Sequence, residues 1–244
     1  MTEIKKIGFI GLGVMGHAIA ANLIADGYEL YVYNRTASKA DDLVADGASY
    51  LPTPRQVAAA SDLIMTMVGY PTDVEEVYFD DTTGIFSGIS AQKIVIDMTT
   101  STPTLAKQIA EKASELDVLT LDAPVSGGDI GAKNRTLTIM AGGDKAAFEQ
   151  ATAIFDKISK KAQYFGPAGS GQHVKMANQI GIAGTMTAMS ELLVYAQAAG
   201  LDLPAVIETL LAGGANTWSL ANYGPRILKD DYSPGFLSNI LSKT

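Results

Sequence analysis

The stretch that decides the fold is Gly8-Phe9-Ile10-Gly11-Leu12-Gly13-Val14-Met15-Gly16, near the start of a chain of 244 residues. Its apolar beginning predicts a strand, its G-x-G-x-x-G spacing a tight turn, and the residues after it a helix. In such a turn the first glycine permits the bend, the second lets the backbone approach a pyrophosphate, and the third lets the helix pack closely on the strand. The N–H groups that begin the helix then attract phosphates. We therefore expect a dinucleotide site that includes Gly11, Leu12, Gly13, Val14, Met15 and Gly16.

The same stretch has a second interpretation, because no residue from Ile7 to Ala25 is formally charged and Lys5 and Lys6 precede the run. Such a run is also typical of a signal peptide or a membrane span. Glycines interrupt it at intervals suited to a turn, however, and Asn22 would be unpaired inside a bilayer. We therefore prefer a strand, a turn and a helix. No other stretch is long and apolar enough to span a membrane, so a cytoplasmic protein is expected.

The composition excludes several classes of function. The chain has 18 Lys and Arg against 26 Asp and Glu, a formal net charge of −8. It therefore lacks the basic surface that nucleic acids and anionic membranes attract, and neither is an expected partner. There is no cysteine, which excludes disulfides, thiolate catalysis and cysteine-based metal centres. The two histidines, His17 and His173, lie too far apart for a short metal motif, and no metal site is expected.

Apolar strand-like runs alternate with helical patterns through the first two thirds of the chain. The expected strands are Ile4–Ile10, Glu29–Tyr33, Leu63–Met67, Ile94–Asp97, Leu119–Asp122, Leu137–Ala141 and, more weakly, Gln163–Phe165. The expected helices between them are Met15–Ala25, Ser38–Ala45, Val74–Tyr78, Pro103–Glu115 and Lys145–Ser159. Strands separated by helix-length segments predict an α/β fold whose mostly parallel, doubly wound sheet is covered on both faces.

The pattern changes after Gly171. Residues 174–199 are predicted to form one long, nearly uncharged helix, and residues 204–211 and 218–228 two more. The glycine-rich stretch 166–171 is then the expected boundary between a dinucleotide-binding domain (1–165) and a smaller, incomplete all-helical domain (166–244). A helix that is apolar around most of its circumference must be covered on several sides. Because so little chain follows it, we expect a homodimer formed through the helical part.

The second expected strand leads into Asn34-Arg35-Thr36, where dinucleotide-binding proteins often carry an acidic residue that holds the adenosine ribose. A carboxylate would repel a 2′-phosphate. Asn34, Arg35 and Thr36 can instead donate hydrogen bonds to it, Arg35 with a full charge. We therefore expect NADP(H) in preference to NAD(H). The alternative is that Arg35 stacks on the adenine and discriminates little between the two.

Three further segments follow expected strands or begin the long helix. They are Asp97-Met98-Thr99-Thr100-Ser101-Thr102-Pro103, Asp122-Ala123-Pro124-Val125-Ser126-Gly127-Gly128 and Gly171-Gln172-His173-Val174-Lys175-Met176-Ala177-Asn178-Gln179. Together with the glycine turn, in this order and over essentially the whole chain, they resemble the β-hydroxyacid dehydrogenases, such as 3-hydroxyisobutyrate dehydrogenase, tartronate semialdehyde reductase and the succinic semialdehyde or glyoxylate reductases. The resemblance implies a Rossmann-type domain and hydride transfer between a nicotinamide and a short hydroxy or oxo acid.

The chemistry of the residues agrees with this resemblance. The turn Ser126-Gly127-Gly128 exposes backbone N–H groups suited to a small carboxylate, unless it is an ordinary turn. Lys175 and Asn178 are spaced i, i+3 and share one helix face. Burial can lower the pKa of a lysine toward neutrality, although a solvated surface lysine is the simpler interpretation. The resemblance implies that Lys175 is the catalytic acid/base and Asn178 its orienting partner. His173, two residues from Lys175, is expected to be structural.

The resemblance also implies residues around the cofactor and the substrate. Thr99 and Thr100 would flank the nicotinamide ribose, and Met67 and Val68 would pack along the cofactor. A second family lysine, which helps to hold cofactor and substrate, corresponds to Lys243. Family members continue beyond this lysine with an acidic residue and a further helix.

Two alternatives stay open. A shortened family member could bind NADP(H) without catalysis, although Lys175 favours descent from an active enzyme. An imine reductase shares this fold, but Lys175 together with the Ser126-Gly127-Gly128 turn argues against it. The length of the chain excludes 6-phosphogluconate dehydrogenase, whose helical domain is far larger.

Overall fold

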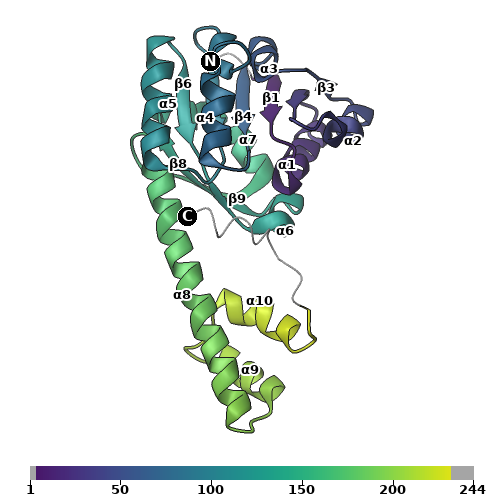
Figure 1. Ribbon diagram of the computed structural model, residues 1–244, viewed down its shortest axis with the longest axis vertical. Helices are drawn as coiled ribbons and strands as arrows, with labels where there is room; N and C mark the ends of the chain where they lie inside the picture. Colours follow the sequence, from purple (N-terminus) through teal and green to yellow (C-terminus); the bar gives the residue numbers. More distant parts are fainter. Residues whose placement is uncertain (1–3, 232–244) are drawn as a thin grey trace. The chain divides into compact units, whose positions relative to one another are not determined.

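The computed structural model describes residues 4–231, which form two compact units (Figure 1). The first unit ends at Lys175 and the second begins at Met176. Helix α8 (Ser170–Ala198) contains the boundary between them.

The first unit is built on a sheet in which an interior strand carries the glycine turn at its end. Parallel strands follow the order β3 (Ser49–Tyr50), β2 (Glu29–Tyr33), β1 (Lys6–Ile10), β4 (Leu63–Thr66), β5 (Ile94–Asp97) and β6 (Leu119–Asp122). Beyond β6 the sheet continues with β8 (Leu137–Gly143), which runs antiparallel to β6. β8 also pairs with β7 (Val125–Ser126), again antiparallel, and with β9 (Ser159–Tyr164), which is parallel to it. The chain leaves β1 to one side for β2 and returns on the other side at β4. Ligands of open α/β sheets bind at the carboxyl ends of the strands beside such a switch point.

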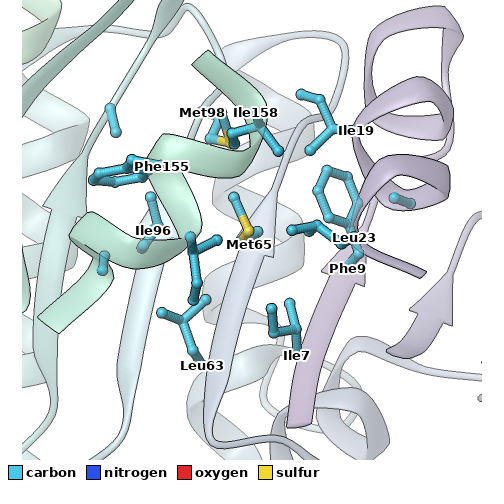
Figure 2. Close-up of a cluster of buried hydrophobic side chains, with 14 of the residues drawn as sticks. Ile7, Phe9, Ile19, Leu23, Leu63, Met65, Ile96, Met98, Phe155 and Ile158 are labelled. Atoms are coloured by element: carbon cyan, nitrogen blue, oxygen red, sulfur yellow. The ribbon is translucent and has the colours of Figure 1, made fainter. Parts of the chain in front are cut away.

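Helices cover both faces of this sheet because the strands are apolar on both sides. Alternate side chains of one strand enter different cores: Leu63 and Met65 lie in one cluster, and Ile64 lies in the other. Figure 2 shows the first cluster, where Phe155 packs with residues of the sheet. Its helices are α1 (Val14–Ala25), α2 (Asp41–Ala45), α6 (Gly128–Lys133) and α7 (Lys145–Ile158). The opposite cluster contains α3 (Pro54–Ala60), α4 (Pro71–Phe79) and α5 (Pro103–Glu115). The predicted mostly parallel sheet with two covered faces is confirmed.

Several short elements differ from the sequence prediction. The predicted helix Ser38–Ala45 divides into a 3₁₀ turn at Ala37–Ala40 followed by α2. The strand predicted from Gln163 to Phe165 is the longer β9, which begins directly where α7 ends. The unpredicted helix α3 starts at Pro54, after Thr53, whose hydroxyl accepts a hydrogen bond from the Gln56 N–H (3.2 Å). A threonine cap with proline in the first turn is a helix start signal that the sequence contained.

The second unit is helical, as predicted. It contains the larger part of α8 together with α9 (Leu203–Leu211) and α10 (Trp218–Ile227). These helices bury a small core made of Met189, Leu193, Ile207 and Leu220. Within residues 4–231, no helix combines the length and the apolar character that crossing a membrane requires.

We expect Phe155→Ala to destabilise the first unit, because Phe155 is fully buried beneath the sheet and its removal leaves a cavity. The free energy of unfolding should fall by about 3–5 kcal/mol. Chemical denaturation followed by far-ultraviolet circular dichroism measures this loss. Phe165→Ala is the matched control, since Phe165 is 46% exposed, and should cost about 0.5 kcal/mol or less. Equal losses would contradict the assignment of the core.

Candidate active site

The glycine turn joins β1 to α1, and its three glycines have different surroundings. Gly11 has φ +98°, a conformation that side chains rarely adopt, and a Cβ at Gly16 would collide with the Gly11 carbonyl oxygen. Gly13 has an ordinary φ of −71° and is exposed, and a Cβ there would meet no atom within 4 Å. No side chain caps the helix that follows. The turn therefore leaves open space in front of uncapped N–H groups, which is the cradle that a pyrophosphate requires.

The remaining residues of the turn divide between the core and the surface. Leu12 is buried, Met15 is partly buried and Val14 is 53% exposed. The turn is tied to the neighbouring strand by the Leu12 N–H, which donates to Asn34 Oδ1 at 2.9 Å. Asn34 Nδ2 donates in turn to the Thr36 carbonyl (2.9 Å). Asn34 thus holds the turn in place, and any contact of Asn34 with a ribose phosphate stays a prediction.

The ends of β4 and β5 are joined by a buried polar cluster. Val68 N–H donates to Thr99 Oγ1 (3.1 Å), and Thr99 N–H donates to Asp97 Oδ1 (3.0 Å). Thr66 Oγ1 also donates to Asp97 Oδ1, at 2.8 Å, so that Tyr78 OH, 3.1 Å from Thr66 Oγ1, must be the donor of that pair. Burial raises the pKa of Asp97 to about 6, and the Thr99 and Thr66 donors act against this rise. The cluster holds the segments that contain Val68 and Thr99, two of the predicted cofactor residues.

At the end of β6, Asp122 holds the beginning of α8. Its two carboxylate oxygens accept the N–H groups of Gly169 and Gln172, both at 2.8 Å. Burial raises the pKa of Asp122, and these N–H donors oppose the rise by stabilising the charged form. Asp122 and Asp97 are register partners in the sheet, so the two predicted segments that begin with them start side by side.

Gln172 connects the first turn of α8 to the segment after β5. It is 2% exposed; its Nε2 donates to the Thr99 carbonyl (2.8 Å) and its Oε1 accepts the Ser101 N–H (3.0 Å). The predicted segments at Thr99, Asp122 and the start of α8 therefore form one hydrogen-bonded unit at the carboxyl edge of the sheet.

Lys175 lies one helical turn after Gln172 and is only 8% exposed. Within residues 4–231, Lys175 Nζ has no hydrogen bond or ion pair. Burial lowers the pKa of Lys175 to about 8, because the charged form loses solvation. An amine of this kind can exchange a proton near neutral pH. His173, by contrast, is exposed.

The other predicted residues have varied surroundings. Ser126 ends β7, and Gly127 and Gly128 have φ values of +132° and +64° before α6. Thr100 and Met67 are partly buried. Asn178 belongs to the second unit, where its Nδ2 donates to Gln179 Oε1 (3.0 Å). Lys243 lies outside the described residues.

Sequence reasoning missed the roles of four polar residues. Asp97 and Asp122 each end a buried strand, and an acidic residue at that place is a signal that could have found them. Gln172 and Asp73 had no local signal. Asp73, on α4, forms an ion pair with Arg35 (3.2 Å between Oδ1 and Nη1). Among residues 4–231 there is no group of three or more His, Asp or Glu side chains that could hold a metal ion.

A parallel sheet of this strand order, with an open glycine turn at its switch point, defines a dinucleotide-binding protein of the Rossmann type. Family models agree: residues 6–166 match the NAD-binding domain of 6-phosphogluconate dehydrogenase, and residues 169–243 match the NAD-binding region of NADP-dependent 3-hydroxyisobutyrate dehydrogenase. The chain belongs to the β-hydroxyacid dehydrogenase family. It is a nicotinamide-dinucleotide-dependent enzyme of the hydroxyacid dehydrogenase or reductase type.

Individual relatives are similar over most of their length. An uncharacterized oxidoreductase of Bacillus subtilis, YkwC, is 50% identical over 95% of this chain and 80% of its own. The 2-hydroxy-3-oxopropionate reductase of Escherichia coli is 42% identical over 95% of this chain and 78% of its own. A solved structure of Mycobacterium tuberculosis 3-hydroxyisobutyrate dehydrogenase with L-serine has a TM-score of 0.87 at 28% identity, covering 96% of this chain and 81% of that one.

Alanine at Gly13 and alanine at Gly16 should impair different properties, dinucleotide binding in the first case and stability in the second. Gly13→Ala places its methyl group in open space, so stability should change by about 1 kcal/mol or less. The same methyl group obstructs the phosphate cradle, and dinucleotide affinity should fall about ten-fold or more, equivalent to one charge-assisted hydrogen bond. Gly16→Ala should lower stability. Thermal unfolding and a calorimetric titration with NADP⁺ and NAD⁺ measure both effects; unchanged affinity of Gly13→Ala would disprove the cradle.

Gln172→Leu should loosen the attachment of α8 to the sheet edge. It leaves the Ser101 N–H and the Thr99 carbonyl unpaired, at a cost of about 1–3 kcal/mol for each buried group. Hydrogen exchange at the Ser101 amide should become faster. Gln197→Leu, at an exposed position of the same helix, is the control. An unaltered Ser101 exchange rate in Gln172→Leu would contradict this role.

Proposed function

We propose that the chain reduces the carbonyl of a short oxo acid or semialdehyde, or oxidises the corresponding hydroxy acid, with NADP(H) in preference to NAD(H) and with Lys175 as the acid/base. One observation carries the proposal: Lys175 is a buried amine without a partner among residues 4–231, and its pKa is lowered to about 8. When bound, the nicotinamide supplies or accepts the hydride.

The chain's own groups divide the remaining work. Lys175, as an ammonium, donates a proton to the carbonyl oxygen in reduction; as a neutral amine it takes the proton back in oxidation. Asn178, one turn further along α8, orients this amine. The N–H groups of the Ser126-Gly127-Gly128 segment bind the substrate carboxylate, and Lys243 helps to hold the substrate.

The cofactor would be held at the carboxyl edge of the sheet. Its phosphates would meet the turn at Gly11, Leu12, Gly13, Val14, Met15 and Gly16, and its 2′-phosphate would meet Asn34, Arg35 and Thr36. Met67, Val68, Thr99 and Thr100 would line the nicotinamide side. The charge of Arg35 and the absence of an acidic residue at the end of β2 support NADP(H).

We also propose that residues 1–165 serve the dinucleotide and residues 166–244 serve substrate binding and homodimer formation. Exposed apolar side chains in the helical unit support an interface there. They are Ile180 (69% exposed), Val194 (66%), Tyr195 (74%), Leu201 (52%) and Trp218 (65%). Light scattering at several protein concentrations measures the assembly.

The function is tested with NADPH and glyoxylate, succinic semialdehyde and tartronate semialdehyde, beside a titration of dinucleotide binding. Turnover of any of these acids supports the proposal. Binding of NADPH without turnover of any of them would favour a binding protein, and turnover of a cyclic imine alone would favour an imine reductase.

Lys175→Ala should lower kcat about 10²–10⁴-fold while dinucleotide affinity is retained.

The unaltered enzyme should show a pH dependence set by the Lys175 pKa of about 8. Below that pH the ammonium is populated, so the rate of reduction should be constant there and fall above it. The rate of oxidation needs the neutral amine and should rise through the same range.

The control for Lys175→Ala is His173→Gln, which changes an exposed side chain on the same helix. Near-normal kcat in Lys175→Ala would disprove the assignment.

A further inference from the structure

The end of β2 lacks the carboxylate that commonly holds the adenosine ribose, yet the fold brings one to the same place from another segment. Asp73 lies in the first turn of α4, 38 positions from Arg35 along the chain. Its Oδ1 is 3.2 Å from Arg35 Nη1. The Arg35 side chain is 79% exposed and the Asp73 side chain 21% exposed.

The Asp73 carboxylate is held where it is by the start of α4. Its second oxygen, Oδ2, accepts the Tyr70 N–H at 2.8 Å. A carboxylate that accepts backbone N–H groups in the first turn of a helix is stabilised there, because the helix dipole favours negative charge at this end. Asp73 is therefore held at the helix start, and the exposed Arg35 side chain is the partner that can move when the pair separates.

The neighbouring residue Asn34 does not supply a second charge for a phosphate. Both ends of its carboxamide are engaged by the backbone, Oδ1 by the Leu12 N–H and Nδ2 by the Thr36 carbonyl. Arg35 is then the only charged group that Asn34-Arg35-Thr36 can offer to a 2′-phosphate, and Asp73 already contacts it.

We propose that Asp73 is a specificity-determining residue: its carboxylate competes with the 2′-phosphate of NADP(H) for Arg35 and so reduces the preference for NADP(H) over NAD(H). This inference rests on the proposed dinucleotide function. An exposed ion pair is weak, so a phosphate can displace Asp73 from Arg35, but the displaced carboxylate stays close and repels the phosphate. NAD(H), which has a hydroxyl at that position, meets no such repulsion.

The test is Asp73→Asn in the full chain, with dissociation constants for NADP⁺ and NAD⁺ measured by calorimetry at low ionic strength. Asparagine keeps an oxygen that can accept the Tyr70 N–H, so the helix start is preserved. NADP⁺ should bind about three- to ten-fold more tightly, a change of the size expected for an exposed charge pair and its repulsion. NAD⁺ affinity should not increase, and the gain for NADP⁺ should shrink as salt is added.

Two matched variants separate this competition from a general change of charge. Glu75→Gln removes the same charge from an exposed position of α4 and should leave the ratio of the two dissociation constants nearly unaltered. In an Arg35→Ala background, Asp73→Asn should tighten NADP⁺ binding less, because the competition for Arg35 is gone and only the repulsion between carboxylate and phosphate remains to be relieved. An unchanged ratio in Asp73→Asn, or an equal shift in Glu75→Gln, would overturn the inference. If the unaltered chain bound neither dinucleotide, the proposed function itself would fail, which is a distinguishable result.

Discussion

The candidate active site depends on one buried interaction, the carboxylate of Asp122 with the N–H groups of Gly169 and Gln172. Burying a carboxylate is costly, and here hydrogen bonds to its charged form compensate the cost. Each charge-assisted hydrogen bond contributes about 1.5–3 kcal/mol. Here the donors are supplied by the chain that enters α8, so the charge and the helix start stabilise each other. The burial of Lys175 within the first unit follows from that attachment.

A second buried carboxylate organises the neighbouring strand end. Asp97 is the register partner of Asp122, and it gathers donors from Thr66 and Thr99 while Asp122 gathers them from α8. Gln172 joins the two arrangements through the Thr99 carbonyl. Buried polar networks of this kind cost stability unless every member is paired, and they are commonly kept where a site must be held rigidly. Burial raises the pKa of Asp97 and lowers the pKa of Lys175, because in both cases it disfavours the charged form.

Elements with strong local signals could be predicted from the sequence. The long apolar strands and the helices between them follow from periodicity, and the sheet between them follows from their alternation. The two-residue strands β3 and β7 and the six-residue helix α6 were not predicted. Elements of this length contain too few residues for a periodic pattern, and they form because neighbouring strands and helices supply their hydrogen bonds and cover. Within the site, Lys175 was predicted because its segment resembles the family motif. Gln172 could not be recognised in this way, because glutamine is usually a surface residue and nothing in the local sequence predicts its burial.

The sequence by itself determined the dinucleotide turn, because the main demands on Gly11 and Gly16 are local: Gly11 has a positive φ, and a Cβ at Gly16 would collide with the Gly11 carbonyl oxygen. It also determined the family, through four segments in a given order. Only the tertiary structure decided which polar groups meet. Asp73 reaches Arg35, and Gln172 reaches both Thr99 and Asp122, across separations of 38 to 73 positions. Pairings over such distances depend on strand order and helix placement, which arise from burial of the whole core and not from the residues that are paired.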